Sequence, residues 1–373
     1  MAREQKIALV HDYLREYGGA ERVLEALHEL YPQAPVYVGF VDWEALGAHA
    51  AKFNNWNIQE TRLTKLPFYK KLYSPYRVFA PGAFAALDLL DYDVVISSSN
   101  AYFAKNVTVR VSATHFCYCH TPPRALYGFS TMSDWKSNPF TKFVGSILNH
   151  FLRVVDYYSA QKVDHFIANS QETARRIQKY YRRDSTVIHP PVALVDQAPP
   201  TPATFDKRSY YLYVNRLALA KHPELAVAVA SRLNLPLKVV GSGKMLQKLK
   251  SMAGETVEFF GSVSDKQLTA LYANAKALLY PVEDEDFGIV PVEAMAFGTP
   301  VIAHKSGGPK ETVKHLKNGI LFEELSEVEL EKAIQLFVAK EATFNPLEIK
   351  TSAQDYSQDV FYRKMTELLK TAN

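Results

Sequence analysis

Two carboxylates that could hold hydroxyl groups, Glu285 and Glu293, stand eight positions apart in the sequence EDFGIVPVE. Phe287 and Gly288 predict a turn after the first glutamate, and Pro291 stands where a helix could begin. The free N–H groups and the positive dipole end of that helix would face the loop and favour an anion, usually a phosphate. The pattern therefore indicates a sugar attached to a phosphate. The alternative is a surface loop followed by an amphipathic helix with solvated glutamates.

A pair of cations, Arg216 and Lys221, follows an apolar run in the sequence NRLALAK. Both side chains could reach one dianionic group from a single loop, the guanidinium as a planar fork and the ammonium as a point charge. The two residues are therefore candidates for binding a diphosphate. Two solvated surface charges would give the same sequence.

Three candidates lie in the first half of the chain. His120 ends the run THFCYCH, where it could act as an acid, a base or a hydrogen-bond donor. A structural histidine bonded to a loop carbonyl is the alternative. Gly18 and Gly19 follow the first apolar run and would let a ligand approach the backbone, although the pair could also only form a tight turn.

The elements that would position these residues form two successive series of alternating strands and helices. Such alternation predicts an α/β fold with doubly wound parallel sheets, whose ligands gather at the carboxyl ends of the strands. Proline-rich residues 191–207 predict a linker between a domain at 1–190 and a domain at 208–355. The strands predicted in the first domain are residues 6–13, 35–40, 92–100, 114–121, 165–171 and 185–192. Those predicted in the second domain are residues 209–217, 237–243, 257–263, 277–282 and 299–304.

Helices are predicted between several of these strands. Residues 20–30 have helical spacing of their apolar side chains, and a further helix is predicted to open after Ser264 as its N-cap. The amphipathic segment 356–370 predicts a helix near the carboxyl end of the chain.

Composition places the chain among soluble globular proteins of two domains. It has 373 residues, of which 47% are hydrophobic and 22% charged. Residues 1–190 have 22 Lys and Arg against 17 Asp and Glu, whereas the remainder has 21 against 22. The excess of basic over acidic residues in the first half is too small for a nucleic-acid-binding surface. It is compatible with that half lying near an anionic surface.

The two cysteines, Cys117 and Cys119, lie at a spacing of two in a predicted strand and would point to the same face. They are too few for a disulfide framework, so buried thiols in a reducing cytosol are expected. No signal peptide and no membrane-spanning segment is predicted from the sequence. A cytoplasmic location follows as an expectation.

The segment at residues 62–77, RLTKLPFYKKLYSPYR, has five basic residues, no acidic residue and interleaved leucine and aromatic side chains. This composition suits the interface of an anionic membrane. An ordinary pair of solvated helices with apolar core contacts is the alternative. The two prolines argue against one long amphipathic helix.

Taken together, the two tandem α/β domains and the sequences RLALAK, GSG, EDFGIVPVE and FGTPVIAHKSGGPKE resemble the retaining nucleotide-sugar glycosyltransferases of family 4, which have the GT-B fold. The resemblance spans nearly the whole chain. In the first half, HDYLREYGGAE and YCHTPPRALY look like the bacterial surface-polysaccharide mannosyltransferases of this family. The resemblance implies two Rossmann-like domains that face a central cleft, with a helix at residues 356–373 joining the first domain.

The resemblance also implies roles for the motif residues of the second domain. Glu285 would bind hydroxyl groups of the donor sugar, and Glu293 would hold the ribose hydroxyls. Arg216 and Lys221 match the basic pair that neutralises the diphosphate. The backbone that would contact the sugar and the phosphates belongs to Phe287, Gly288 and Ile289.

Four more residues receive roles in the same way. His120 matches a histidine that contacts the donor sugar, and Gly18 and Gly19 match a glycine loop that faces the diphosphate and the acceptor. Val263 falls where backbone atoms meet the base. His222 departs from the family, which usually has glycine after the lysine.

The reaction implied is transfer of a hexose from a nucleotide sugar, with GDP-mannose favoured over a UDP-hexose, to a hydroxyl of a lipid-linked glycan or an oligosaccharide in cell-surface polysaccharide synthesis. No cofactor and no metal ion is expected, because the basic pair would replace the metal. Peripheral contact with an anionic membrane through residues 62–77 stays one of the two interpretations given above, and no nucleic-acid partner is expected. The alternatives are a sugar-nucleotide epimerase of similar fold and a non-catalytic nucleotide- or sugar-binding protein.

Overall fold

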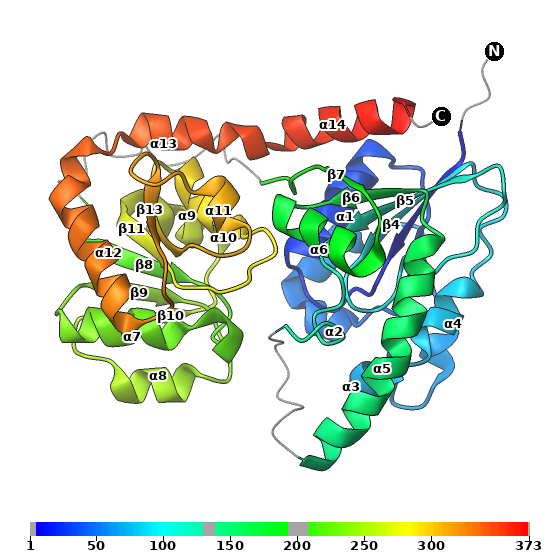
Figure 1. Cartoon of the computed structure of the whole chain (residues 1–373), viewed down its shortest axis with the longest axis horizontal. Coiled ribbons are helices and arrows are strands. Elements are labelled where there is room, and N and C mark those ends of the chain that lie inside the picture. Colours follow the sequence, from blue (N-terminus) through cyan, green and yellow to red (C-terminus); the bar gives the residue numbers. More distant parts are fainter. Residues whose placement is uncertain (1–4, 130–138, 193–207, 372–373) are drawn as a thin grey trace. The chain divides into compact units, whose positions relative to one another are not determined.

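The computed structural model describes residues 5–129, 139–192 and 208–371 of the chain (Figure 1). The chain divides into two compact units. The first comprises Met1–Pro191 together with Phe361–Asn373, and the second comprises Val192–Val360. Most of the predicted linker, residues 193–207, lies outside the described residues. Among the residues that are described, no helix has the length and the apolar character needed to cross a membrane.

The first unit is built on a sheet of seven parallel strands in the order β3-β2-β1-β4-β5-β6-β7. Six of these strands were predicted, whereas β3 is a short edge strand without an apolar pattern. The strands are β1 (Ile7–His11), β2 (Val36–Val38), β3 (Ile58–Glu60), β4 (Val94–Ser99), β5 (Thr114–Cys119), β6 (His165–Ala168) and β7 (Ser185–Val187).

Helices cover both faces of this sheet, because successive residues of a strand point to opposite sides. In β1, Leu9 packs in one apolar cluster with α1, whereas Ala8 and Val10 pack in another with α4. The thiols of Cys117 and Cys119 are buried on the same side of β5, as predicted. The helices of the first unit are α1 (Gly19–Leu30), α2 (Trp43–Leu46), α3 (Tyr69–Tyr76), α4 (Ala80–Ala85), α5 (Pro139–Gln161) and α6 (Gln171–Tyr181).

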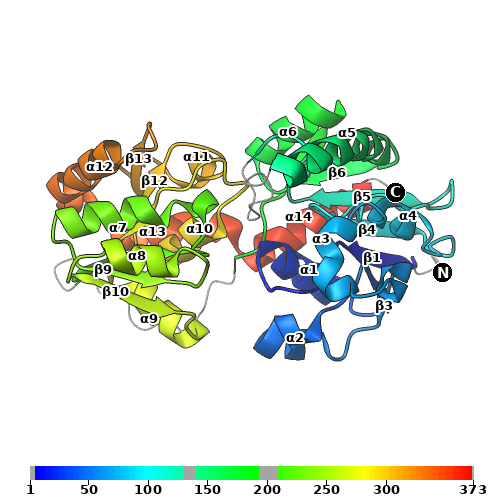
Figure 2. The same cartoon turned by 90° about the horizontal axis from the view of Figure 1, so that it is seen from below.

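The long helix α5 packs beside α6 (Figure 2) and has no counterpart among the predicted helices. Residues 62–77 form two short helical pieces, a 3₁₀ turn at Arg62–Lys65 and α3, as the prolines predict. The amphipathic tail forms α14 (Gln358–Thr371), and its residues Phe361, Met365 and Leu369 are buried in the cluster that contains α1.

The second unit is built on a sheet of six parallel strands in the order β10-β9-β8-β11-β12-β13. One continuous apolar cluster forms its core. The strands are β8 (Tyr210–Val214), β9 (Leu237–Val240), β10 (Val257–Gly261), β11 (Ala275–Tyr280), β12 (Val301–His304) and β13 (Gly319–Phe322). The helices are α7 (Pro223–Arg232), α8 (Leu246–Met252), α9 (Asp265–Asn274), α10 (Ile289–Ala296), α11 (Pro309–Thr312), α12 (Glu327–Lys340) and α13 (Pro346–Ser352).

The strand order reverses once in each sheet, between β1 and β4 in the first and between β8 and β11 in the second. At such a reversal the connections leave the two strands in opposite directions, so a crevice opens outside the carboxyl ends of the strands. These two places are therefore where the sheet topology favours ligand binding.

Candidate functional site

The reversal in the second sheet brings two of the predicted residues together. Lys221 ends the 3₁₀ turn Leu219–Lys221 in the connection that follows β8, and Glu285 lies in the connection that follows β11. The ammonium group of Lys221 donates to Oε2 of Glu285. Each of these side chains is 15% exposed, so the pair is largely shielded but still reachable from solvent.

Tyr280, the last residue of β11, donates its hydroxyl to the same oxygen of Glu285 at 3.0 Å. Burial raises the pKa of Tyr280 well above its usual range, and the adjacent Glu285 carboxylate adds to that effect. Tyr280 therefore stays protonated and acts as a neutral donor. The Glu285 carboxylate is held in place by one charged donor and one neutral donor.

The position of Lys221 depends on backbone contacts around its turn. The hydroxyl of Tyr213, in β8, donates to the carbonyl oxygen of Lys221 at 2.9 Å. The next residue, His222, has a left-handed backbone with φ of 47°, and its ring lies 3.1 Å from Oε1 of Glu224. Glycine adopts a left-handed conformation without steric cost, which explains why the family usually has glycine at the position of His222. Arg216, on the same connection, has an exposed side chain.

The connection after β11 is held by close backbone contacts with the glycines of SGGPKE. The N–H of Gly308 donates to the carbonyl oxygen of Glu285 at 2.8 Å. A Cβ atom on Gly307 would lie 2.0 Å from that same oxygen, and one on Gly308 would lie 2.1 Å from the carbonyl oxygen of Phe287. Larger residues at these two positions would push the Glu285 loop away.

Helix α10 begins directly after this loop. Gly288 is its N-cap with φ of 84°, and Ile289 is its first residue, so the predicted helix starts slightly before Pro291. Its first N–H groups lie next to the predicted loop, as the anion-site hypothesis requires. Glu293 lies one turn further along α10, where the Tyr272 hydroxyl donates to its Oε2 at 2.9 Å.

The connections after β8, β9 and β10 are also joined to one another. A Cβ atom on Gly241 would lie 1.9 Å from the carbonyl oxygen of Asn215. The N–H of Gly241 donates to the carbonyl oxygen of Gly261 at 2.8 Å. Val263 follows Gly261 and is partly buried against the core. The helix after it opens at Ser264, whose Oγ accepts from Gln267, as predicted.

The reversal in the first sheet holds a chain of buried polar side chains. The ring of His120 places Nε2 at 2.8 Å from the hydroxyl of Ser98, and Nδ1 of His11 lies 3.0 Å from that hydroxyl. Nε2 of His11 lies 3.6 Å from Oε1 of Glu21, whose other oxygen accepts from the N–H of Gly18 at 2.8 Å. One interpretation of His120 was a structural histidine bonded to a loop carbonyl. Its ring instead contacts the hydroxyl of Ser98.

Burial lowers the pKa of His120 to about 3, and the neighbouring His11 adds to the effect. The imidazole is therefore uncharged at neutral pH and acts through hydrogen bonds rather than as a cation. Gly18 precedes α1 with φ of −124°, an extended conformation that any residue adopts, and Gly19 is the exposed first residue of the helix. The two glycines therefore do not form a tight turn that requires positive φ.

Asp12 is a further residue of this edge, and it was not predicted from the sequence. Its carboxylate accepts backbone N–H groups from Asn100, Ala101, Tyr102 and Ala104 at distances of 2.7–2.9 Å. Three of these bonds reach Oδ2 and one reaches Oδ1, so Asp12 fixes the connection after β4. An aspartate directly after a buried strand was the available signal.

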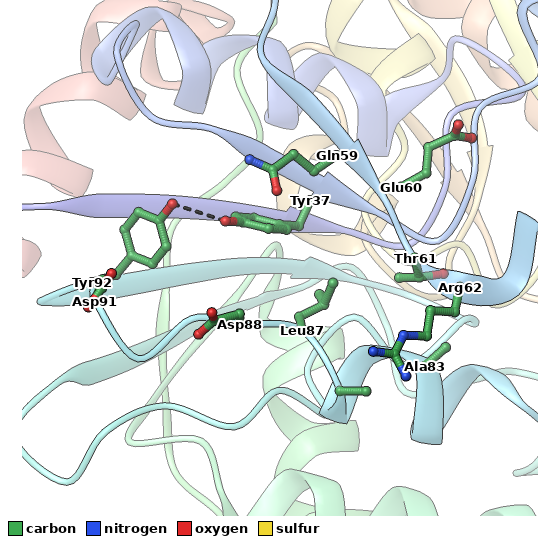
Figure 3. Close-up of a pocket in the computed structure, with 11 residues that line it drawn as sticks. Tyr37, Gln59, Glu60, Thr61, Arg62, Ala83, Leu87, Asp88, Asp91 and Tyr92 are labelled. Atoms are coloured by element: carbon green, nitrogen blue, oxygen red, sulfur yellow. Dashed lines mark hydrogen bonds between the residues drawn. The ribbon is translucent and has the colours of Figure 1, made fainter.

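A separate concavity of about 360 Å³ lies in the first unit and contains none of the predicted site residues (Figure 3). Tyr37 and Tyr92 are linked across it by a hydrogen bond of 3.0 Å. Its lining otherwise comes from β3 and the two residues after it, from α4 and from the connection before β4, and it is mostly polar. Across the described part of the chain, no group of three or more His, Cys, Asp and Glu side chains could hold a metal ion.

Comparison with known proteins identifies both halves of the chain. Residues 17–195 match the family model described as Glycosyltransferase Family 4, and residues 196–355 match that of Glycosyl transferases group 1. Alpha-1,3/1,6-mannosyltransferase ALG2 of Homo sapiens is 27% identical over 68% of this chain and 67% of its own length. A GDP-mannose-dependent alpha-mannosyltransferase of Mycolicibacterium smegmatis is 37% identical, over 32% of this chain and 31% of its own length.

Solved structures with the same fold cover nearly the whole chain. The lipopolysaccharide outer core galactosyltransferase WaaB superposes with a TM-score of 0.67 at 16% identity, covering 99% of this chain and 100% of its own. HepE of Anabaena, solved with UDP and glucose, superposes with a TM-score of 0.69 at 18% identity, covering 98% of this chain and 100% of its own. These neighbours are glycosyltransferases of the GT-B fold, so the predicted fold class is confirmed.

Proposed function

Since the chain belongs to the family 4 glycosyltransferases, we propose that it transfers a hexose from a nucleotide sugar to an acceptor hydroxyl with retention of the anomeric configuration. The observation that supports this most directly is the meeting of Lys221 and Glu285 beside the start of α10. The cation and the helix N-terminus there suit the diphosphate of a nucleotide sugar, and the carboxylate suits its sugar hydroxyls.

The difficult step in this reaction is the departure of a diphosphate while positive charge develops on the sugar. Arg216 and Lys221 would stabilise the leaving diphosphate, together with the N–H groups that follow Gly288. Glu285 would hold sugar hydroxyls. The acceptor is expected to attack from the face that the diphosphate leaves, with a phosphate oxygen taking its proton, so that no protein nucleophile is required.

Further residues keep their proposed roles toward the donor. Glu293 would hold the ribose hydroxyls, and its bond from Tyr272 would orient the carboxylate. His120 would contact the donor sugar as a neutral hydrogen-bonding group, and the backbone at Gly18 and Gly19 would face the diphosphate. Val263 would offer backbone atoms to the base. We propose that Arg216 and Lys221 together replace a divalent metal ion.

The donor that we favour is GDP-mannose, because relatives with matching sequence are named as mannosyltransferases and one is named as GDP-mannose-dependent. A UDP-hexose is the second candidate, since a structural neighbour was solved with UDP-glucose. The acceptor that we propose is a lipid-linked glycan at the cytoplasmic face of a membrane, approached by a peripheral enzyme. The basic segment at residues 62–77 would contribute to this membrane contact.

The experiment that tests this function is a screen of GDP- and UDP-hexoses that measures release of the free nucleotide, each with and without an acceptor glycan. We expect one nucleotide sugar to be turned over much faster when acceptor is present. Interconversion of the donor sugar without acceptor would instead identify an epimerase. Tight binding of a nucleotide sugar without any turnover, with or without acceptor, would identify a binding protein.

A further inference from the structure

Helix α5 has an unusual distribution of side chains, because it buries an asparagine and an aspartate while it exposes large apolar residues. Asp156 is fully buried, where its Oδ1 lies 2.5 Å from the ammonium of Lys105 and its Oδ2 accepts from Tyr127 at 2.8 Å. Asn149 is also buried and accepts from the guanidinium of Arg77 at 3.0 Å. These contacts attach one side of α5 to the first unit by ion pairing and hydrogen bonding.

The solvent-facing side of α5 carries a stripe of apolar side chains. Its three largest members are Phe143, Phe151 and Tyr158, which are 64–65% exposed. The stripe is completed by Val144, Ile147, Leu148, Val154 and Val155. At about 1.5 Å per residue, the stripe from Phe143 to Tyr158 is about 22 Å long. An exposed apolar surface of this extent on one element marks an interaction site rather than scattered surface residues.

The exposed charged side chains of α5 and of residues 62–77 are all basic. On α5 between Phe143 and Tyr158 the exposed basic side chains are His150 and Arg153, and the one acid in that stretch is the buried Asp156. Arg77, which contacts α5, closes the basic segment at residues 62–77, which has no acidic residue. Phe68 and Phe79, which flank α3, are 75% and 55% exposed, so this segment also combines cations with apolar side chains.

We propose that the outward side of α5, together with residues 68–79, docks on an anionic lipid bilayer. The aromatic and aliphatic side chains would enter the boundary between headgroups and acyl chains, and the surrounding lysines and arginines would contact anionic headgroups. A second copy of the chain is a poorer occupant. Two such faces would bring cations against cations with no exposed carboxylate among the α5 residues to pair with them.

This inference rests on the proposed function only in the choice of a membrane as partner, since it names the surface that would bring the enzyme to a lipid-linked acceptor. Lipid binding can be measured without any donor or acceptor. Its failure is therefore distinguishable from failure of the proposed transfer reaction, which the nucleotide-release screen measures.

The test is co-sedimentation of the whole protein with vesicles of phosphatidylglycerol and phosphatidylethanolamine, and with vesicles of phosphatidylcholine alone. We expect binding to the anionic vesicles that weakens as salt is added. The triple variant F143S/F151S/Y158S should bind them at least about tenfold more weakly, since it removes the three largest apolar groups. The charge variant K70E/K71E should lose binding to the anionic vesicles while keeping the apolar stripe.

The matched control is V328S/V338S/L347S, which removes three exposed apolar side chains of the second unit and should bind vesicles like the unaltered protein. Thermal unfolding and nucleotide release should be the same for both triple variants. Equal binding to neutral and anionic vesicles would overturn the charge part of the proposal. A stable dimer that F143S/F151S/Y158S converts to monomers, with no vesicle binding by the unaltered protein, would overturn the whole proposal in favour of a second copy.

Discussion

Lys221 and Glu285 form an ion pair that joins the connections after β8 and β11, the two strands between which the second sheet reverses its order. The proposed roles assign these residues to different parts of one donor, the ammonium to the diphosphate and the carboxylate to the sugar. A diphosphate that approaches Lys221 therefore competes with Glu285 for the ammonium group. Release from the lysine would leave the carboxylate available to sugar hydroxyls, with Tyr280 still holding it in place.

Removing either member of this pair should reduce transfer strongly. We expect Lys221→Ala to lower turnover by about 10²-fold or more, because a positioned cation for the leaving group is lost. Glu285→Ala should give a loss of about the same size. The measurement is nucleotide release at saturating donor, with Lys317→Ala, an exposed lysine of the same unit, as control. Unchanged transfer by the Glu285 variant would refute the role proposed for that carboxylate.

The close approach of Gly307 to the Glu285 loop predicts a large effect of one methyl group. Gly307→Ala would place Cβ 2.0 Å from the carbonyl oxygen of Glu285, at a backbone φ of 57°. We expect a loss of about 2–4 kcal/mol in the free energy of unfolding, together with impaired transfer. Gly82→Ala is the matched control, because nothing lies within 4 Å of its Cβ position, and it should leave stability unchanged or slightly raised. Urea unfolding of both variants checks this.

His222→Gly should be tolerated or stabilising. The histidine has a left-handed backbone, φ of 47°, which costs a residue with Cβ about 1 kcal/mol, whereas glycine adopts it freely. The greater flexibility of glycine in the unfolded chain offsets part of this gain. We therefore expect the free energy of unfolding to change by about 0 to +1 kcal/mol, with transfer activity retained. A clear loss of stability would show that the contact of the ring with Glu224 matters more than the backbone strain.

Stability should fall as the pH is lowered below neutrality. Burial holds the folded-state pKa of His120 at about 3, against about 6.5 in an unfolded chain. Above pH 6.5 both states are neutral at this histidine. Below it the unfolded state binds a proton that the folded state does not, so stability is lost at up to about 1.4 kcal/mol per pH unit as the pH falls toward 3. Burial of His115, whose pKa is about 4, acts in the same direction.

Urea titrations between pH 7 and pH 5 would measure this slope. His120→Gln keeps a hydrogen-bonding side chain but cannot titrate, so the variant should show a smaller dependence on pH. An identical slope in the variant and the unaltered protein would mean that His120 is not buried in its neutral form.

Transfer should proceed in the presence of a chelator. We propose that Arg216 and Lys221 provide the positive charge that a divalent ion supplies in other transferases. Rates measured with EDTA should therefore be close to those measured without it, at the same donor and acceptor concentrations. Full inhibition by EDTA that is reversed by added Mg²⁺ or Mn²⁺ would refute the metal-independent mechanism.

The residues of the second unit could largely be predicted because their signals are local. The turn at Gly288, the start of α10 and the N-cap at Ser264 each depend on a few neighbouring residues. The partners of Glu285 and His120 could not be predicted, since Tyr280 and Ser98 reach them only after the sheet has placed their strands. Sequence order does not show which strands become neighbours.

Helix α5 was missed for a different physical reason. Sequence patterns assign apolar residues to the interior, but on this helix the inward positions include Asn149 and Asp156, whereas Phe143 and Phe151 face outward. Strand β3 was missed because its three residues are polar or half-exposed at the edge of the sheet.

The burial of α14 in the first unit has a consequence for the order of folding during synthesis. Phe361, Met365 and Leu369 fill the same apolar cluster as α1, and the hydroxyl of Tyr362 donates to Glu29 of that helix. These residues are translated after every residue of the second unit. The first unit to emerge from the ribosome therefore lacks part of its own core until the second unit has been completely translated, so we expect the second unit to finish folding first.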